Sequence, residues 1–459
     1  MFKHLSRDKA FYKTLLTLSA PMILQNLINN SLSMLDTFMV GTLGEAAMAG
    51  VTLGNTLFFV ASLLTFGLQS GCSVLISQYW GKGDIKTINR IMGIGFALSG
   101  VVSLIVALGA TFFPMQIFSL TSNDPELVAV AAEYARVVAF TQVFANLSLI
   151  YIAAQRSTEN PRFGMYVLVS TMIIDTFLSW VFIFGKLGMP AMGVKGAALG
   201  TLIGSVYEFA FTFIYALRNK RLRLMPKYFF RPGMIIFKDF VKYSLPVVLN
   251  EFAWGFGFSL YAIIIGHMPD AIVAVAAYTI TLTIERLLSA MYFGVGSAAS
   301  ILVGKPLGMG DREAAHTAGV TMTAITFFVG IIAGLLMLLF THVFIVPVLF
   351  PLFGAGEQTL YVGRIMLIIV SIAMPFRAFN FCNIVGVLRG GGDVKAAFML
   401  DIIGMYGVGI PFGALAGLVF GANIIVVYLI FNLEEVVKLV FGYIRFSQKK
   451  WLQNVTRDL

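Results

Sequence analysis

Apolar segments of membrane-spanning length alternate along the chain with short polar, glycine-containing or proline-containing turns. A helix needs about 20 mostly apolar residues to cross a hydrocarbon layer roughly 30 Å thick. Twelve segments meet this requirement, and several exceed it, so we expect some helices to tilt or to project beyond the bilayer. The predicted spans are 14–40, 46–78, 88–113, 127–155, 163–185, 192–217, 243–266, 271–303, 313–350, 358–388, 394–418 and 421–444. Gln25 and Asn30 interrupt the first apolar stretch, so we expect a retained first helix rather than a cleaved signal peptide.

The composition agrees with this pattern. Hydrophobic residues make up 58% of the 459 residues and charged residues 12%, whereas an average soluble domain is about 25% charged. The chain therefore lacks the charge that would cover a soluble surface, which excludes a soluble enzyme, a nucleic-acid binder and a disordered scaffold. Its two cysteines, Cys72 and Cys382, lie far apart in apolar segments and are expected to be small buried side chains.

The basic residues predict the orientation in the membrane. Of the 32 Lys and Arg residues, 25 fall in the segments on the same side as the N-terminus, and only Lys186 and Lys195 fall in the opposite turns. This asymmetry predicts a multi-pass protein of the cell (inner or plasma) membrane with both termini in the cytoplasm. The net charge of +10 is then a topology signal that favours contact with anionic membrane lipids, and nucleic acid is not expected as a partner.

The two halves of the chain repeat each other. Ser19-Ala20-Pro21 opens the first span, and Ser244-Leu245-Pro246 opens the seventh. The segments 67–84 and 294–311 share Ser, Gly and Asp at matching positions. Because each half holds six spans, we predict two pseudo-symmetric six-helix bundles around a central cleft, related as parallel repeats. The expected organisation is an N-terminal bundle, a basic cytoplasmic linker and a C-terminal bundle, at 1–217, 218–242 and 243–459.

Polar side chains within the N-terminal spans indicate a cation site. A charge at the bilayer centre costs roughly 2.5–3.5 kcal/mol on insertion scales, so a carboxylate within a span is expected to have a role in function or structure. In the first span one helix face carries Asn26, Asn29, Asn30, Ser33 and Asp36. Asp175 lies deep in the fifth span, and Thr201 in the sixth. We predict that Asp36, Asp175, Thr201 and Asn26 form a cation-coupling site. The two carboxylates fit either a proton or, as metal ligands, Na⁺.

Carboxylates and aromatic rings are combined in the C-terminal spans. Glu251, Trp254, Phe258 and Tyr261 share a face of the seventh span, a combination that suits an organic cation. Glu285 is a further candidate for ligand binding, although a structural ion pair with Arg377 is its favoured role. Glu434 and Lys438 are spaced as an i,i+4 pair, and the pattern assigns no role to Asp401.

Several kinds of chemistry have no motif in the sequence. No glycine-rich loop for ATP phosphates is present, so an ion gradient is the expected energy source. No zinc-protease, CxxC or serine-hydrolase motif is present either, so neither enzyme activity nor a cofactor is expected. Gly196, Gly200 and Gly204 are spaced by four residues and predict close helix packing.

Three motifs together resemble the MATE (multidrug and toxic compound extrusion) family, a branch of the multidrug/oligosaccharidyl-lipid/polysaccharide exporter superfamily. They are the segments 36–41 (DTFMVG), 78–84 (QYWGKGD) and 388–393 (LRGGGD), and the resemblance covers nearly the whole chain. It implies a transporter in which Na⁺ or H⁺ enters as an organic, usually cationic, compound leaves.

The resemblance also implies roles for single residues. Asp36 matches the family's first-span Asp, and Glu251 matches an essential seventh-span Glu. Asp393 is the nearest match to an Asp that follows the Arg-Gly motif, and it falls at the membrane edge. The fifth span departs from the family pattern, because Asp175 stands where Asn is usual and Ser179 follows four positions later.

We therefore expect a secondary active multidrug efflux antiporter that works by alternating access and functions as a monomer. The alternative within the superfamily is a flippase or exporter of a lipid-linked or polysaccharide precursor, which would need several Arg side chains around its pyrophosphate. An integral membrane enzyme and a passive channel are less favoured, because the spans show neither a catalytic cluster nor a sign of oligomeric pore symmetry.

Overall fold

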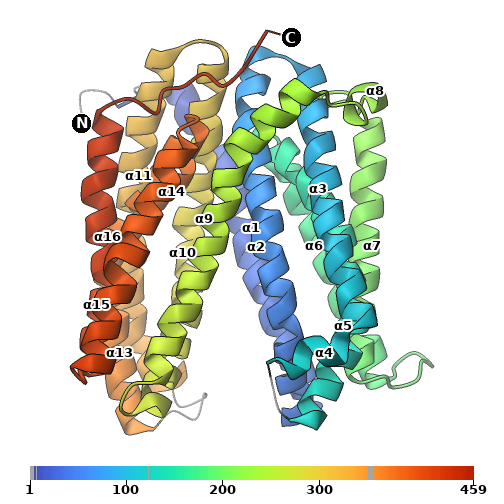
Figure 1. Cartoon of the computed structure of the whole chain (residues 1–459), viewed down its shortest axis with the longest axis vertical. Helices are drawn as coiled ribbons and strands as arrows, with labels where there is room; N and C mark the ends of the chain where they lie inside the picture. The colour runs from blue at the N-terminus through green and yellow to red at the C-terminus, as the bar shows by residue number, and fades with distance from the viewer. Residues whose placement is uncertain (1–4, 7, 122–123, 350–355, 459) are drawn as a thin grey trace. The chain divides into compact units, whose positions relative to one another are not determined.

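The structure is a computed structural model that describes residues 5–6, 8–121, 124–349 and 356–458. Within these residues the chain is helical and contains no strand, which confirms the predicted all-α membrane fold. The helices are α1 (Lys9–Gly41), α2 (Glu45–Lys82), α3 (Ile85–Phe112), α4 (Pro114–Ser119), α5 (Pro125–Ser157), α6 (Pro161–Phe184), α7 (Val194–Arg218), α8 (Pro226–Phe229), α9 (Met234–Gly266), α10 (Ala271–Gly308), α11 (Arg312–Phe340), η2 (Thr341–Leu349), α13 (Glu357–Phe381), η3 (Cys382–Leu388), α14 (Val394–Gly404), η4 (Met405–Gly409), α15 (Ile410–Ala414), η5 (Leu415–Val419) and α16 (Ile424–Ser447) (Figure 1). The η elements are π-helical.

Each predicted span coincides with a long helix or with consecutive helical elements. Among the described residues, ten helices are long and apolar enough to cross a membrane, from Ala47–Lys82 to Val394–Val419. The first and last predicted spans correspond to α1, with 33 residues, and α16, with 24. The span that begins at Val394 contains two π-helical stretches on either side of α15, which carries Pro411. Proline removes a backbone donor, and π-helical turns are one way in which a helix accommodates such an interruption.

The helices confirm the internal repeat. Helices α1 and α9 both have 33 residues and an internal proline, Pro21 and Pro246, while α2 and α10 both have 38 residues. The motif that ends with Asp84 or Asp311 caps the next helix in both halves. The Asp84 side chain accepts a hydrogen bond from the Thr87 N–H at 3.0 Å, and Asp311 accepts one from Ala314 at 2.8 Å. Such caps satisfy backbone donors that a helix start leaves free.

The chain forms two compact units whose edges differ from the predicted bundles. The N-terminal unit is Gln25–Glu251, and the C-terminal unit is Met1–Leu24 with Phe252–Leu459. The boundaries therefore fall inside α1 and α9 rather than at a separate linker. Leu15, Leu18 and Met22 of α1 belong to a core cluster with residues of α10 and α11. A hydrophobic pattern identifies a helix but does not show what each part of it packs against.

The segment between α7 and α9 is shorter than the predicted linker 218–242, because α7 ends at Arg218 and α9 begins at Met234. It docks on α3 of the N-terminal unit. The Asn89 side chain donates to the Arg223 carbonyl oxygen at 3.1 Å and accepts from the Met225 N–H at 2.8 Å. The Gly93 backbone lies directly against the Phe229 carbonyl, where a side chain would not fit. The segment is thus fixed to one unit.

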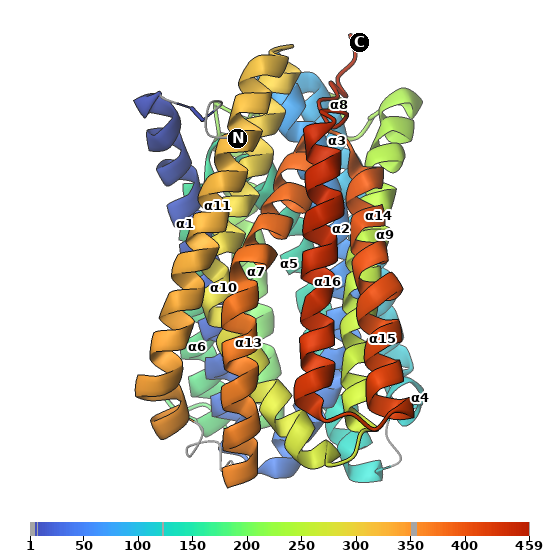
Figure 2. The ribbon, with the colours of Figure 1, turned by 90° about the vertical axis from the view of Figure 1, so that its left-hand side faces the viewer.

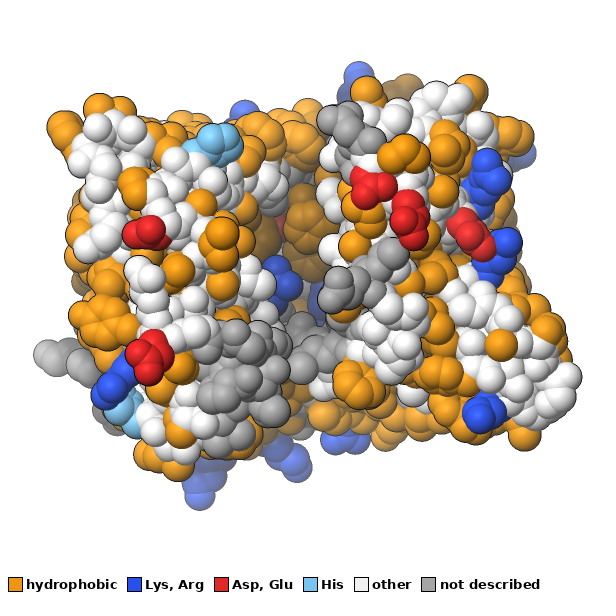
Figure 3. All heavy atoms as spheres, turned by 90° about the horizontal axis from the view of Figure 1, so that it is seen from below, with side chains coloured by type: hydrophobic (Ala, Val, Ile, Leu, Met, Phe, Trp, Pro, Cys, Tyr) orange, Lys and Arg blue, Asp and Glu red, His pale blue; other side chains and the backbone are white. Residues whose placement is uncertain are grey.

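Large apolar side chains are exposed along both units, among them Ile105 (65%) and Ile372 (62%). Figure 2 shows α11, α13 and α16 running lengthwise in the C-terminal unit, and Figure 3 shows apolar side chains around the rim of each unit. Such surfaces are expected where helices face lipid. Together with the apolar helices, they define a multi-pass membrane protein.

Candidate functional site

Among the described residues of the N-terminal unit, the most buried carboxylate is that of Asp175, which is 3% exposed on α6. The Ser179 hydroxyl, one turn further on, donates to the Asp175 carboxylate at 3.2 Å. Thr201 on α7 makes a second side-chain hydrogen bond with Asp175. The structure therefore brings together Asp175 and Thr201, as predicted, and adds Ser179.

Asp36 completes this group from α1. Its side chain is partly buried, and its carboxylate is near enough to Asp175 for the two negative charges to repel each other. Tyr134 on α5 interacts electrostatically with both carboxylates, and its hydroxyl donates to the Asn55 side chain of α2 at 3.2 Å. We call Asp36, Asp175 and these four polar neighbours the carboxylate pair site: the neighbours are Asn55, Tyr134, Ser179 and Thr201.

The sequence analysis did not select Asn55 and Tyr134. In the sequence, these two residues are distinguished only as polar side chains within apolar spans, and many other positions have the same property. Asn26, which was selected, lies ten residues before Asp36, or about 15 Å along a helix. The structure therefore separates Asn26 from the carboxylate pair.

Close packing of α6 against α7 positions the pair site. A Cβ on Gly196 would come within 2.5 Å of the Phe182 backbone, one on Gly200 within 2.3 Å of the Ser179 Oγ, and one on Gly204 within 3.0 Å of the Asp175 Cβ. These contacts confirm the packing role predicted for the three glycines. They let α7 approach closely enough for Thr201 to reach Asp175.

The pair site offers oxygen atoms to a cation from carboxylates and hydroxyls. Within the described residues, no group of three or more His, Cys, Asp or Glu side chains forms a metal site. Asp36 and Asp175 would thus hold Na⁺ only with the help of neutral oxygens such as those of Ser179 and Thr201, whereas either carboxylate alone is able to hold a proton.

In the C-terminal unit, the rings predicted on one face of α9 form a continuous aromatic row. The ring centroids of Trp254 and Phe258 are 4.5 Å apart, and those of Phe258 and Tyr261 are 5.9 Å apart. Tyr261 also stacks on Phe431 of α16, with 3.9 Å between centroids. Trp254, at the start of the row, is 39% exposed and so remains accessible. Glu251 is buried and is the last residue of the N-terminal unit.

The carboxylate that contacts this aromatic row is Glu434, which accepts a hydrogen bond from the Tyr261 hydroxyl at 2.5 Å. Lys438 lies among three carboxylates: its Nζ is 3.2 Å from Glu434, 3.5 Å from Asp401 and 3.6 Å from Glu435. The lysine is itself 4% exposed. The predicted Glu434–Lys438 pair is therefore confirmed, but it forms part of a larger buried network that includes Asp401.

The network continues to the predicted pair of Glu285 and Arg377, which form a salt bridge. Arg377 also donates to the Asn432 side chain at 2.8 Å. Asn380 donates to Glu435 at 2.8 Å. We call Glu285, Arg377, Asp401, Glu434, Glu435 and Lys438 the C-terminal charge network.

Glycines make room for this network. A Cβ on Gly404 would come within 2.5 Å of the Lys438 Cε, and one on Gly409 within 2.1 Å of the Tyr261 hydroxyl oxygen. Gly404 directly precedes the π-helical element η4, and Gly409 is its last residue. The sequence contains the i,i+4 pair, but the links to Asp401 and Tyr261 join helices that are distant in the chain.

Asp393, the remaining predicted ligand residue, lies elsewhere in this unit. It is 6% exposed at the start of α14, and Arg445 of α16 donates to its carboxylate at 2.7 Å. It precedes Asp401 by eight residues, or about 12 Å along a helix. The structure thus places it in an ion pair apart from Tyr261 and Glu285.

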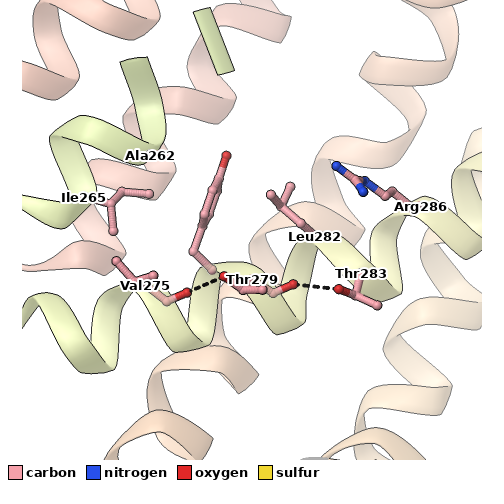
Figure 4. Close-up of a pocket in the computed structure, with 8 residues that line it drawn as sticks. Ala262, Ile265, Val275, Thr279, Leu282, Thr283 and Arg286 are labelled. Carbon is pink, nitrogen blue, oxygen red and sulfur yellow. Dashed lines mark hydrogen bonds between the residues drawn. The ribbon is translucent and has the colours of Figure 1, made fainter. Parts of the chain in front are cut away.

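A small pocket of about 240 Å³ lies between α9 and α10 of the C-terminal unit (Figure 4). Its lining residues are Ala262, Ile265, Val275, Tyr278, Thr279, Leu282, Thr283 and Arg286. Thr279 and Thr283 donate to backbone carbonyls of their own helix, at 2.8 and 2.9 Å. The volume is below the roughly 300–1,000 Å³ of typical ligand pockets, so this pocket alone would not hold a drug-sized molecule.

Glu208 on α7 was not among the predicted site residues, yet it is a buried carboxylate, 8% exposed, within an apolar span. The sequence feature that could have identified Glu208 as a candidate is its position within the apolar stretch 196–217. It shares its helix with Thr201 of the pair site.

The two repeated helical units with polar groups buried between apolar spans define a membrane protein of the transporter class. The MatE family model matches residues 21–181 and 246–415, one stretch in each half of the repeat. The chain belongs to the MatE family, whose members are membrane transporters and not enzymes.

Individual relatives agree with this assignment. A probable multidrug resistance protein NorM of Thermotoga maritima is 24% identical over 87% of this chain and 84% of its own length. The multidrug resistance protein MdtK of Yersinia pseudotuberculosis is 26% identical over 88% of both chains. Among solved structures, the eukaryotic MATE transporter AtDTX14 matches the fold with a TM-score of 0.84, at 20% identity and 97% coverage of both chains.

Proposed function

We propose that this protein is a secondary active multidrug efflux antiporter, which exports organic and mostly cationic compounds in exchange for Na⁺ or H⁺ by alternating access. The observation that carries the proposal is the carboxylate pair of Asp36 and Asp175, surrounded by hydroxyl groups inside the N-terminal unit. Relatives named as multidrug resistance proteins support the choice of substrate class. The proposal includes a cell-membrane location, both termini in the cytoplasm and a functional monomer.

The pair site supplies a reason for a cation to bind. Two carboxylates near each other repel, and the repulsion is strong where little water screens it. Uptake of a proton or of Na⁺ relieves this repulsion. If the cation and the exported compound prefer different conformations of the transporter, binding of the cation drives release of the compound.

The aromatic row of the C-terminal unit supplies contacts for an organic cation. Trp254 and Phe258 pack edge to face, and Trp254 is 39% exposed; a cation over an aromatic ring face gains about 0.5–2 kcal/mol. Glu251 is proposed to add Coulomb attraction. The coupling cation and the exported compound would then depend on different residues.

The C-terminal charge network argues against the alternative of a pyrophosphate-lipid flippase. Such a transporter would need Arg side chains free to bind phosphate. In this structure Arg377 is bound by Glu285 and Asn432. We therefore favour antiport of organic cations.

Efflux of ethidium from proteoliposomes tests the proposal, with a pH gradient and a Na⁺ gradient imposed separately. We expect one of the two gradients to drive efflux in the wild type and neither to do so in Asp36→Asn or Asp175→Asn. Efflux in both variants at the wild-type rate would show that the carboxylate pair is not the coupling site. No efflux under either gradient in the wild type would contradict antiport of organic cations.

A further inference from the structure

Glu208 is a buried carboxylate that the proposed coupling site does not use. It lies within the span Val194–Arg218 and is 8% exposed. In the part of the chain that the structure describes, no basic side chain pairs with Glu208 and no hydrogen bond reaches its carboxyl group. A charge in this position is costly, so such residues in membrane proteins commonly belong to ion or proton pathways.

The register between α6 and α7 places Glu208 relative to the carboxylate pair. The two helices run antiparallel, with Gly200 against Ser179 and Gly204 against Asp175. Further along, the ring of Tyr215 stacks on that of Phe163, with 4.1 Å between centroids. Between these contacts, each step of four residues along α7 matches four residues back along α6. Glu208 therefore lies at the level of Thr171, one helical turn, or about 6 Å, beyond Asp175.

Two hydroxyl groups near this level lack partners. The Oγ1 atoms of Thr171 on α6 and Thr212 on α7 are buried and make no hydrogen bond within the described residues. Buried polar atoms normally have a partner, and ordered water is a common one. Two hydroxyls and a carboxyl group supply the two to four polar partners that a buried water requires. Water at this level would bridge Glu208 to its surroundings.

A hydrogen-bonded cluster lies nearer the end of α7 and begins at Tyr215, seven residues or about 10 Å along the helix from Glu208. Asn160 donates to the Tyr215 hydroxyl at 3.3 Å and to Gln155 at 2.9 Å. Gln155 in turn donates to the Tyr151 hydroxyl at 2.8 Å, and Asn219 donates to the same hydroxyl at 3.2 Å. Asn219 opens the basic linker, which the distribution of Lys and Arg assigns to the cytoplasmic side. Thr212 lies between Glu208 and this cluster, and water would have to fill the rest of the route from the pair site.

We propose that Glu208 is a second proton-binding station, which accepts the coupling proton from Asp175 through water and releases it to water on the way to the cytoplasmic end of α7, past the polar groups that end at Asn219. The inference rests on the proposed antiport and adds a route to it. In the first transfer the Asp175 carboxyl group loses a proton and becomes a carboxylate, and water delivers the proton to a Glu208 carboxylate oxygen. In the second transfer the Glu208 carboxyl group loses this proton to water and becomes a carboxylate again. No other reactant is consumed.

The surroundings of Glu208 suit a proton better than a metal ion. A hard metal cation is held by a shell of several oxygen ligands, whereas Glu208 is a single carboxylate beside two hydroxyl groups. The titratable and charged side chains of α6 are Arg162, Tyr166 and Asp175. Those of α5 are Glu126, Glu133, Tyr134, Arg136, Tyr151 and Arg156, of which Glu133 is bound to Lys195 at the opposite end of α7. None of these provides a second carboxylate at the level of Thr171.

The test compares three properties of the full-length protein: pH-gradient-driven ethidium efflux, gradient-free ethidium counterflow, and the pH profile of ethidium binding. In Glu208→Gln we expect loss of driven efflux and a changed pH profile, while counterflow and ethidium affinity are retained. Glu208→Asp should keep part of the driven efflux, and Thr171→Val should reduce it. The matched control Glu133→Gln, on an exposed face, should behave as the wild type in all three assays.

Two results for Glu208→Gln would overturn the relay. One is driven efflux at the wild-type rate with an unchanged pH profile, and the other is an equal loss of counterflow and driven efflux, which would indicate a structural role. Coupling to a Na⁺ gradient alone would also overturn it. Asp175→Asn separates the two proposals: if that variant fails to couple while Glu208→Gln couples normally, only the relay is wrong, and if both couple normally, the proposed coupling site is wrong as well.

Discussion

Gly67 on α2 lies against Val248 on α9, so that a Cβ added to the glycine would come within 2.6 Å of the Val248 Cα. The other half of the chain repeats this contact, since a Cβ on Gly294 of α10 would come within 2.4 Å of the Ile23 Cγ1 of α1. Both glycines begin the motif that recurs at 67–84 and 294–311. The repeat in the sequence therefore encodes a packing contact, in which a missing side chain lets a proline-containing helix approach closely.

Alanine at either glycine should destabilise the protein. We expect Gly67→Ala and Gly294→Ala each to cost about 1–3 kcal/mol, because the added methyl group meets atoms that have to move. Thermal unfolding in detergent measures this cost. Gly266→Ala is the matched control, since a Cβ there meets nothing within 4 Å. Equal melting temperatures for all three variants would contradict the close contacts.

The paired caps at Asp84 and Asp311 give a second comparison between the halves. Asp84→Ala and Asp311→Ala each remove the acceptor for a backbone N–H at a helix start, and each should cost about 1 kcal/mol. Melting temperatures of the two variants should fall by similar amounts. Glu357→Ala removes an exposed carboxylate from the first turn of α13 without removing a side-chain cap, and is the reference for the loss of one negative charge. A fall for only one of the two caps would show that the repeat is not equivalent in stability.

The sequence carries local information about this fold more fully than tertiary information. Apolar runs identify the helices, and spacing alone identifies the Glu434–Lys438 pair. The division of α1 after Leu24 was not predictable, because the same apolar helix pattern continues through the boundary. Likewise, the position of Glu208 relative to Thr171 depends on the register between two helices, which the packing of Gly200 and Gly204 determines.

Candidate site residues show the same limit. The stripe from Asn26 to Asp36 is one face of a helix, and Asp36, at its far end, is the residue that interacts with Asp175. Asp401 had no assigned role, because its partner Lys438 lies on another helix, 37 residues later in the chain. A charged residue within a span is identified from the sequence as a candidate site residue. Its interaction partners, however, depend on which helices pack against each other.

Lys438 should be essential for the stability of the C-terminal unit. Lys438→Met leaves buried carboxylates without their shared cation, and removal of one partner from a buried ion pair costs about 3–5 kcal/mol. Thermal unfolding should show a large fall for Lys438→Met. The double variant Lys438→Met/Glu434→Gln should recover part of the loss, because it removes one of the stranded charges. A double variant less stable than Lys438→Met would mean that Glu434 is stabilised by Tyr261 more than by the lysine.

Separate roles for the carboxylate pair and for Glu251 predict different defects in Asp36→Asn and Glu251→Gln. Asp36→Asn removes one charge of the carboxylate pair and should abolish gradient-driven ethidium efflux to near background, because binding of the coupling ion no longer relieves a repulsion. Glu251→Gln removes the proposed attraction for the organic cation, so it should weaken ethidium binding as well as efflux.

Fluorescence titration and proteoliposome efflux on the same preparations measure both quantities, and size-exclusion profiles check that each variant is folded. Exposed Glu133 provides the control Glu133→Gln, which should match the wild type in binding and efflux. Efflux at the wild-type rate in both Asp36→Asn and Glu251→Gln would rule out the carboxylate mechanism, whereas a binding defect in Asp36→Asn equal to that in Glu251→Gln would show that one site serves both ligands.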